Sequence, residues 1–283
     1  MLKKYVPDTS LVTTWDVAEK FEKCPLMVVY EFDNKHLIYV GTKHNSRTNK
    51  AKESFDAINY AFANFGIECV VTEVERACKN IDCLYKQDMS ELAYSAYVAK
   101  RKEIPYIFAD TNIADWIQKF DEFSHKRAIQ LQTMWILNDA RKYKLHFSKP
   151  DTVELAFENV KYNLRQMGYD MTLTLLEFEQ CCKDDFGCVV SDENVSDILD
   201  KLQNWAEPNI KGNITNKLWA EINVYSRTPY MLEKIFKAIN KYNTVLVTMG
   251  AGHFEEQRLV LEKAFGQPFY IDKFPHSKQI GKI

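Results

Sequence analysis

The sequence has no long apolar run. No window approaches the roughly 20 apolar residues that a membrane-spanning helix needs, and its best runs are as short as residues 26–30. Near the amino terminus, Pro7 and Asp8 interrupt the chain before an apolar stretch of signal-peptide length can form. We therefore expect a soluble, cytoplasmic protein that has no secretory signal and no membrane partner.

An excess of charge of one sign is also missing. The formal net charge is −2, from 37 Lys and Arg against 39 Asp and Glu. Short basic runs at 100–102 and 141–144 fall in stretches with helical periodicity, where a solvated helix face explains them. The sequence therefore predicts no nucleic-acid partner.

Cysteines are few and odd in number. A chain of 283 residues with seven cysteines is large enough to fold without disulfides. Cys78 with Cys83, or Cys182 with Cys188, could be imagined as metal ligands, but neither pair has a histidine close by. Free thiols in a reducing compartment are the simplest interpretation.

Apolar residues are plentiful enough for a sizeable core. Hydrophobic residues make up 46% of the chain, with 17 Phe and 15 Tyr. The length favours a single domain, 1–283, over two full domains. We expect an α/β core from residues 1–111 and 224–275, interrupted by a helical insert at 112–223. The insert could be a lid, a substrate wall or a dimer face.

The predicted core alternates strands and helices. Residues 26–32 and 37–41 are β-rich and flank a polar turn at 33–36, which indicates a hairpin. Apolar runs and helical periodicities then predict the following order: helix 51–65, strand 67–72, helix 89–103, strand 105–109, helix from 228, strand 244–250, helix 255–265 and strand 269–271. Strands joined through helices run parallel, so with the hairpin the sheet is predicted to be mixed.

Four of these strands lead into a polar residue. They are followed by His44, Glu73, Asp110 and His253, and both histidines come after a glycine turn, GTKH and GAGH. Ligand sites in such sheets lie outside the carboxyl ends of the strands. We therefore expect these side chains to meet at one edge of the sheet.

Two histidines and a carboxylate suit a divalent metal, or a general base with its orienting partner. Each residue also has a plainer interpretation. A histidine after a glycine turn is often a loop residue or a helix cap, and Glu73 could pair with Arg76. Asp110 could cap a helix at 111–120, which is the role that the sequence favours for it.

Arg227 precedes a predicted helix start. Thr228 is a suitable cap, and Pro229 is suited to the first helical position. Arg227 could be an ordinary solvated arginine. At a helix mouth beside the second histidine, it could instead bind an anion or a developing oxyanion.

These motifs resemble the TraB/PrgY/Tiki family, and more distantly the erythromycin esterases and ChaN haem-binding proteins. The resemblance rests on GTKH at 41–44, TEVER at 72–76, FAD at 108–110, Arg227, and MGAGHF at 249–254. It implies an α/β fold of the EreA/ChaN-like type with paired sheets, and metal-dependent peptide hydrolysis in the Tiki branch. Matched by position, the functional residues are His44, Glu73, Arg227 and His253. Ala109 and Thr111 differ from the family pattern.

Three functions remain open. In the first, a divalent ion (manganese, cobalt or zinc) held by His44, His253 and Glu73 activates water for hydrolysis of a peptide or related amide or ester, and Arg227 stabilises the oxyanion. If Glu73 is not a ligand, it becomes the general base. The second is a metal-free, esterase-like hydrolase in which one histidine activates water and Arg227 orients the substrate. The third is a non-catalytic regulatory protein that binds a peptide or haem.

Overall fold

The computed structural model describes residues 4–14, 24–42, 49–73, 91–110, 124–142, 152–166, 170–193, 213–272 and 274. The chain divides into two compact units, the first from residues 1–15, 20–110 and 227–283 and the second from 16–19 and 111–226. The second unit overlaps the predicted insert, 112–223. That the chain forms a single domain stays a prediction.

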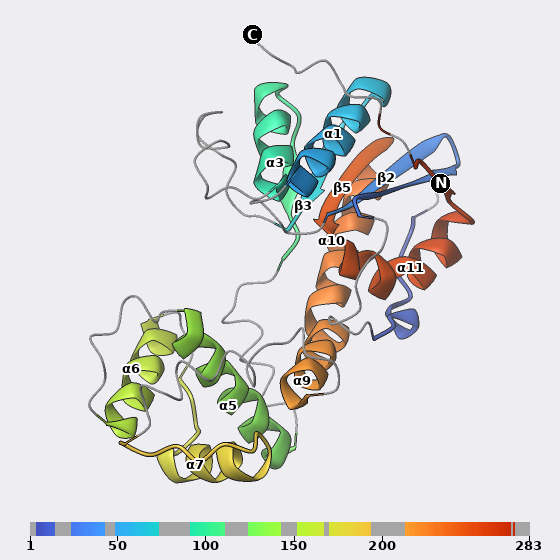
Figure 1. The fold of residues 1–283 in the computed structure, drawn as a ribbon. Helices are drawn as coiled ribbons and strands as arrows, with labels where there is room; N and C mark the ends of the chain where they lie inside the picture. The colour runs from blue at the N-terminus through green and yellow to red at the C-terminus, as the bar shows by residue number, and fades with distance from the viewer. Residues whose placement is uncertain are drawn as a thin grey trace. The chain divides into compact units, whose positions relative to one another are not determined.

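A six-stranded sheet organises the first unit, with the order β4-β3-β5-β2-β1-β6 (Figure 1). The strands are β1 (Leu26–Phe32), β2 (Lys35–Thr42), β3 (Cys69–Thr72), β4 (Tyr106–Phe108), β5 (Thr244–Gly250) and β6 (Phe269–Tyr270). The neighbours β2, β5, β3 and β4 are parallel, whereas β1 is antiparallel to β2 and β6. The predicted α/β class and mixed sheet are confirmed. Where the family resemblance implies paired sheets, the described residues form one sheet.

The hairpin β1–β2 is confirmed, with a tighter turn than predicted. Asp33 and Asn34 have positive φ values of 44° and 61°, which suits a two-residue turn between twisted strands. Asp and Asn tolerate this conformation better than other non-glycine residues. Lys35 and His36, predicted as part of the turn, belong to β2.

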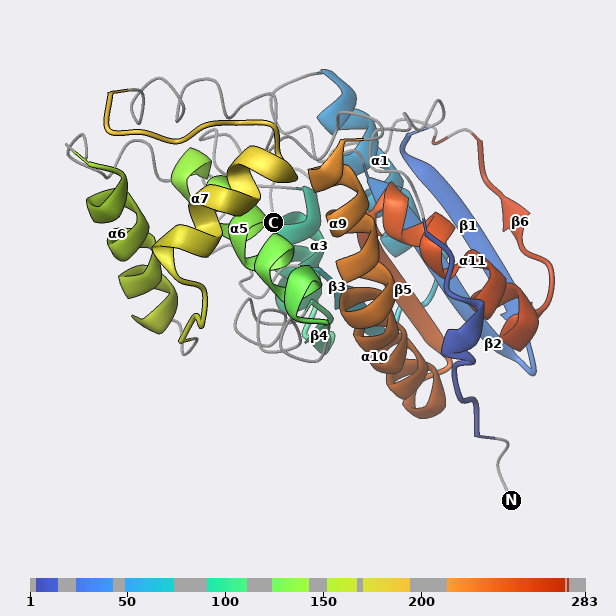
Figure 2. The same cartoon turned by 90° about the horizontal axis from the view of Figure 1, so that it is seen from below.

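Helices cover both faces of the sheet (Figures 1 and 2). On one face, α1 (Asn49–Asn64) and α3 (Glu91–Arg101) share a core with Leu246 of β5. On the other, α10 (Thr228–Lys241) and α11 (Ala251–Phe265) share a core with Val245 and Val247. Successive strand side chains point to opposite faces, so an apolar run such as β5 serves both layers.

The start of α10 corrects one prediction. Thr228 is not a helix cap, because Asn223–Arg227 is already helical as a π-helix (η3) and no side chain caps α10. A cap bonds the free N–H groups of a first turn, and a preceding helical turn removes that need. The predicted buried face of α10 is confirmed, since Leu232, Ile235, Phe236 and Ile239 are all almost fully buried.

The start of α11 corrects a second prediction. The helix begins at Ala251, directly after β5, rather than at residue 255. His253 therefore lies in a helical first turn and not in a loop, and the two glycines of GAGH fall at the strand end and within that turn.

The second unit is helical in its described parts. Its helices are α5 (His125–Lys142), α6 (Val153–Gln166), α7 (Leu175–Asp184) and α9 (Ile214–Ile222), which share one apolar core. A capping box between Thr174 and Glu177 starts α7. Among the described residues of the whole chain, no helix combines the length and hydrophobicity needed to cross a bilayer.

Gly41 marks a close approach between β2, β1 and α11. A Cβ atom at Gly41 would lie 2.8 Å from Leu26 Cδ2 and 3.0 Å from the Cα atom of Ala251. Backbone at that distance cannot move aside easily, and Leu26 is itself buried. A glycine is therefore required where the first turn of α11 packs onto the end of β2.

We predict that Gly41→Ala lowers the free energy of unfolding by about 1–3 kcal/mol, because the added methyl overpacks this contact. Chemical denaturation measures the change. Gly66→Ala is the matched control, since a Cβ atom there meets nothing within 4 Å, and we expect it to change stability by no more than about 1 kcal/mol. Equal effects of the two substitutions would contradict the close approach at Gly41.

Candidate functional site

The carboxyl ends of the parallel strands bring four predicted residues together. Glu73 directly follows β3, and Asp110 lies just beyond β4. Arg227 precedes α10, and His253 stands in the first turn of α11. His44, the other predicted histidine, lies outside the described residues, so its place stays a prediction.

Glu73 is the centre of the group. Its Oε2 atom accepts a hydrogen bond from the backbone N–H of Gly250, at 2.8 Å. Its Oε1 atom lies 3.2 Å from Arg227 Nη2 and 3.3 Å from His253 Nε2. The side chain is 9% exposed. A largely buried carboxylate therefore joins the end of β5 to two cationic side chains.

Arg227 makes a two-point contact with Asp110. Its Nε donates to Oδ1 at 3.1 Å and its Nη2 to Oδ2 at 2.6 Å. Burial disfavours the charged guanidinium, but the attraction of Asp110 and the hydrogen bonds to it, together with Glu73 and Glu256, outweigh burial and raise the pKa of Arg227. Arg227 remains a cation at any physiological pH.

This pairing revises the sequence-based roles. Arg227 is neither a solvated arginine nor at a free helix mouth, because its side chain is 12% exposed and the residues before it are helical. The carboxylate of Asp110 binds Arg227. Arg76, proposed as a partner of Glu73, lies outside the described residues, as does the helix at 111–120 that Asp110 was expected to cap.

His253 faces carboxylates through both ring nitrogens. Nδ1 lies 3.1 Å from Oε2 of Glu256, and Nε2 faces Glu73. Burial disfavours the imidazolium, but the attraction of Glu73 and the hydrogen bonds with Glu256 and Glu73 outweigh burial and the repulsion of Arg227, raising the pKa of His253 to about 9. At neutral pH the ring is doubly protonated and donates to both carboxylates.

Glu256 and Thr228 complete the setting of His253. The sequence interpretation missed Glu256 and assigned Thr228 a different role, that of a helix cap. Glu256 is 1% exposed, and its Oε2 atom accepts a hydrogen bond from the Thr228 hydroxyl at 2.5 Å. The detectable signal was the three-residue spacing of His253 and Glu256, which places both on one side of a helix. That signal depends on α11 beginning before His253.

Tyr39 is a further buried group that the sequence did not indicate. It is fully buried in β2, its ring packs edge-on against Phe254 at 5.1 Å between centroids, and its hydroxyl makes no hydrogen bond among the described residues. Burial, followed by the charges of Glu73 and Glu256, raises the pKa of Tyr39 well above its ordinary value. The phenol stays neutral.

The residues match part of a metal site. His253 Nε2 and Glu73 Oε1 are 3.3 Å apart, a separation that fits two ligands each about 2.1 Å from one ion. Glu256 behind Nδ1 is the partner that a metal-binding histidine usually has. Within the described parts of the chain, however, no three His, Cys, Asp or Glu side chains group as metal ligands.

Comparisons with protein-family models, curated proteins and solved structures found no match. We therefore infer the function from the geometry of one group of residues, which we call the Glu73 cluster: Glu73, Asp110, Arg227, His253 and Glu256.

The raised pKa of His253 predicts a loss of stability in alkali. Its pKa is about 9 in the folded chain against an ordinary 6.5, so its contribution is complete below pH 6.5 and disappears as the pH rises through 9. That contribution is on the order of 3 kcal/mol. Denaturant unfolding from pH 6 to 10 measures it. His253→Gln should remove this part of the pH dependence, and identical profiles for the two proteins would contradict the ion pairs.

Arg227→Leu should be strongly destabilising. It leaves the buried carboxylates of Glu73 and Asp110 without their shared cation, a change that typically costs about 3–5 kcal/mol. Thermal and denaturant unfolding measure the loss. Arg165→Leu is the control, because its ion pair with Asp170 is exposed and we expect little change. A stable Arg227→Leu protein would show that the pairing does not hold these elements together.

Proposed function

We propose that this protein is a hydrolase that cleaves a peptide or a related amide or ester at the Glu73 cluster. The observation that carries the proposal is the carboxylate of Glu73, held at the carboxyl ends of the strands between the cationic side chains of Arg227 and His253. Acyl hydrolysis needs a base for water and positive donors for the developing oxyanion. One small group of side chains offers both.

The chain's own residues would divide the work as follows. Glu73 accepts a proton from the attacking water, whose oxygen bonds to the substrate carbonyl carbon. Once protonated, the Glu73 carboxyl no longer attracts Arg227 and the Nε2–H of His253 as an anion, and both then donate toward the carbonyl oxygen as it becomes negative. The carbon–nitrogen or carbon–oxygen bond then breaks, and the proton on Glu73 passes to the leaving group. Asp110 and Glu256 hold the two cationic side chains in place.

A divalent ion is part of our first version of this proposal. His253 and Glu73, with His44 as predicted from the sequence, would hold manganese, cobalt or zinc. Such an ion would supply a Lewis acid that polarises a carbonyl and lowers the pKa of bound water. His253 must lose a proton from Nε2 to bind it, and Glu256 would keep the proton on Nδ1. Metal binding would therefore release a proton.

A metal-free hydrolase is the second version, and one observation favours it. Both ring nitrogens of His253 face carboxylates, and its pKa is about 9. A doubly protonated imidazole suits oxyanion stabilisation without an ion. In this version Glu73 is the general base, in place of the histidine that the sequence suggested, because the protonated His253 cannot accept a proton from water. Arg227 orients the substrate.

The proposed fold type is that of the EreA/ChaN-like proteins. Its support is the chain order of the motifs: GTKH, TEVER, FAD, Arg227 and GAGHF, of which the described members lie around one sheet edge. A helical segment falls between the third and fourth motifs.

The test combines elemental analysis of the purified protein with hydrolysis of a blocked-peptide library and simple esters, before and after chelation. Bound metal with chelator-sensitive cleavage supports the first version. Cleavage that survives chelation supports the second. Binding of peptide or haem without any turnover would overturn the hydrolase proposal in favour of a regulatory protein.

Two substitutions test the residues. We predict that Glu73→Gln and His253→Ala each lower kcat/KM by a factor of about 100 or more, because one removes the base and the other a transition-state donor. Steady-state kinetics on folded protein measures this. Glu31→Gln, at the far end of β1, is the control and should retain activity. Normal turnover by either site variant would exclude that residue from the mechanism.

A further inference from the structure

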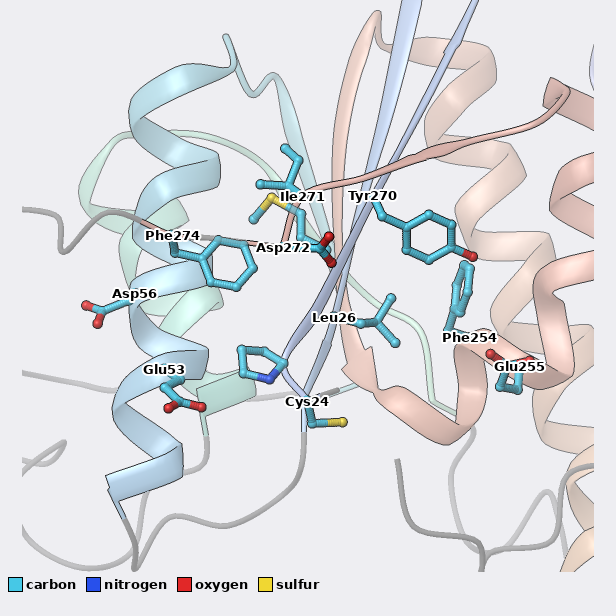
Figure 3. Close-up of a pocket in the computed structure, with 12 residues that line it drawn as sticks. Cys24, Leu26, Glu53, Asp56, Phe254, Glu255, Tyr270, Ile271, Asp272 and Phe274 are labelled. Atoms are coloured by element: carbon cyan, nitrogen blue, oxygen red, sulfur yellow. The ribbon is translucent and has the colours of Figure 1, made fainter. Parts of the chain in front are cut away.

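A pocket of about 680 Å³ lies beside the amino-terminal end of β1 (Figure 3). Because β1 is antiparallel to β2, with Leu26 paired to Gly41, the pocket lies at the same end of the sheet as the Glu73 cluster. Phe254 and Glu255, which follow His253 in the first turn of α11, form one wall. The pocket and the Glu73 cluster thus share one helical turn.

The inner wall of the pocket is apolar and aromatic. Leu26 and Phe254 are buried there, at 7% and 1% exposure. Tyr270 and Phe274 flank the pocket on opposite sides in Figure 3. Tyr270 is 55% exposed, so an apolar ligand would cover a large aromatic surface that now faces solvent.

Among the described residues that line the pocket, every charged one is acidic. They are Glu53 and Asp56 of α1, Glu255 of α11, and Asp272 after β6. Arg258 neutralises Glu255, with Nε 3.2 Å from Oε2. Glu53 and Asp272 are both exposed and form no ion pair among the residues that the structure describes. An apolar cavity whose rim carries carboxylates that no described residue neutralises favours a ligand that is both apolar and cationic.

We infer that this pocket binds an arginine or lysine side chain of a peptide, which would make basic peptides the substrate class of the proposed hydrolase. Such side chains have an apolar stem and a cationic head. The stem would lie along Leu26 and Ile271, and the head would face Glu53 and Asp272. The substrate assignment rests on the proposed function, whereas the binding does not.

The test is a binding measurement with blocked pentapeptides that differ only in their central residue, which is arginine, norleucine or glutamate. Isothermal titration calorimetry at low and high salt measures Kd. We expect the arginine peptide to bind about tenfold more tightly than the norleucine peptide at low salt, and the preference to shrink as salt screens it. Equal affinities for all three peptides would overturn the inference.

Paired variants locate the effect. Glu53→Gln combined with Asp272→Asn changes only exposed side chains, so the fold should persist, and we expect the arginine preference to fall to about that of norleucine. Glu31→Gln removes an exposed carboxylate at the far end of β1 and should keep the arginine preference. An unchanged preference in the double variant would overturn the assignment to this pocket.

Turnover of the same peptides separates the two proposals. Preferential binding without cleavage would support the pocket assignment and contradict the proposed hydrolase activity. Cleavage of all three peptides at equal kcat/KM would support the hydrolase activity and contradict the proposal that the pocket selects basic side chains.

Discussion

The buried carboxylate of Glu73 is the interaction on which the first unit depends. One oxygen bonds the backbone of Gly250 at the end of β5, and the other faces Arg227 before α10 and His253 in α11. These contacts join segments that are far apart in the chain. Removing any one charge would leave its buried partners with less compensating charge, which is far more costly than losing an exposed ion pair.

The backbone around this carboxylate is fixed by close packing as well as by charge. Gly41 lets the first turn of α11 approach the end of β2, so His253 projects from a short, rigid connection rather than from a loop. Glu256 and Thr228 then orient the imidazole from behind. Rigid supports of this kind are what a reactive group needs if its geometry is to persist through a reaction.

Much of the fold could be predicted from the sequence because it depends on local patterns. The apolar runs of β3 and β5 and the helical periodicity of α10 each signal their element, and polar residues at strand ends indicated the edge where Glu73 and His253 meet. The partners could not be predicted this way. That Arg227 binds Asp110 depends on contacts between residues more than a hundred positions apart. The prediction that Thr228 caps a helix was wrong, because a π-helical turn before α10 has no clear sequence signal.

Titration of the histidine ring resonances by NMR tests the central claim most directly, since the chain has only 6 histidines to assign. If Glu73 and Glu256 hold His253 as an imidazolium, its pKa lies near 9, and Glu73→Gln moves it down toward the ordinary 6.5. A wild-type His253 that titrates at or below 6.5 would contradict the ion-pair network, and with it the positive donors that the proposed chemistry requires.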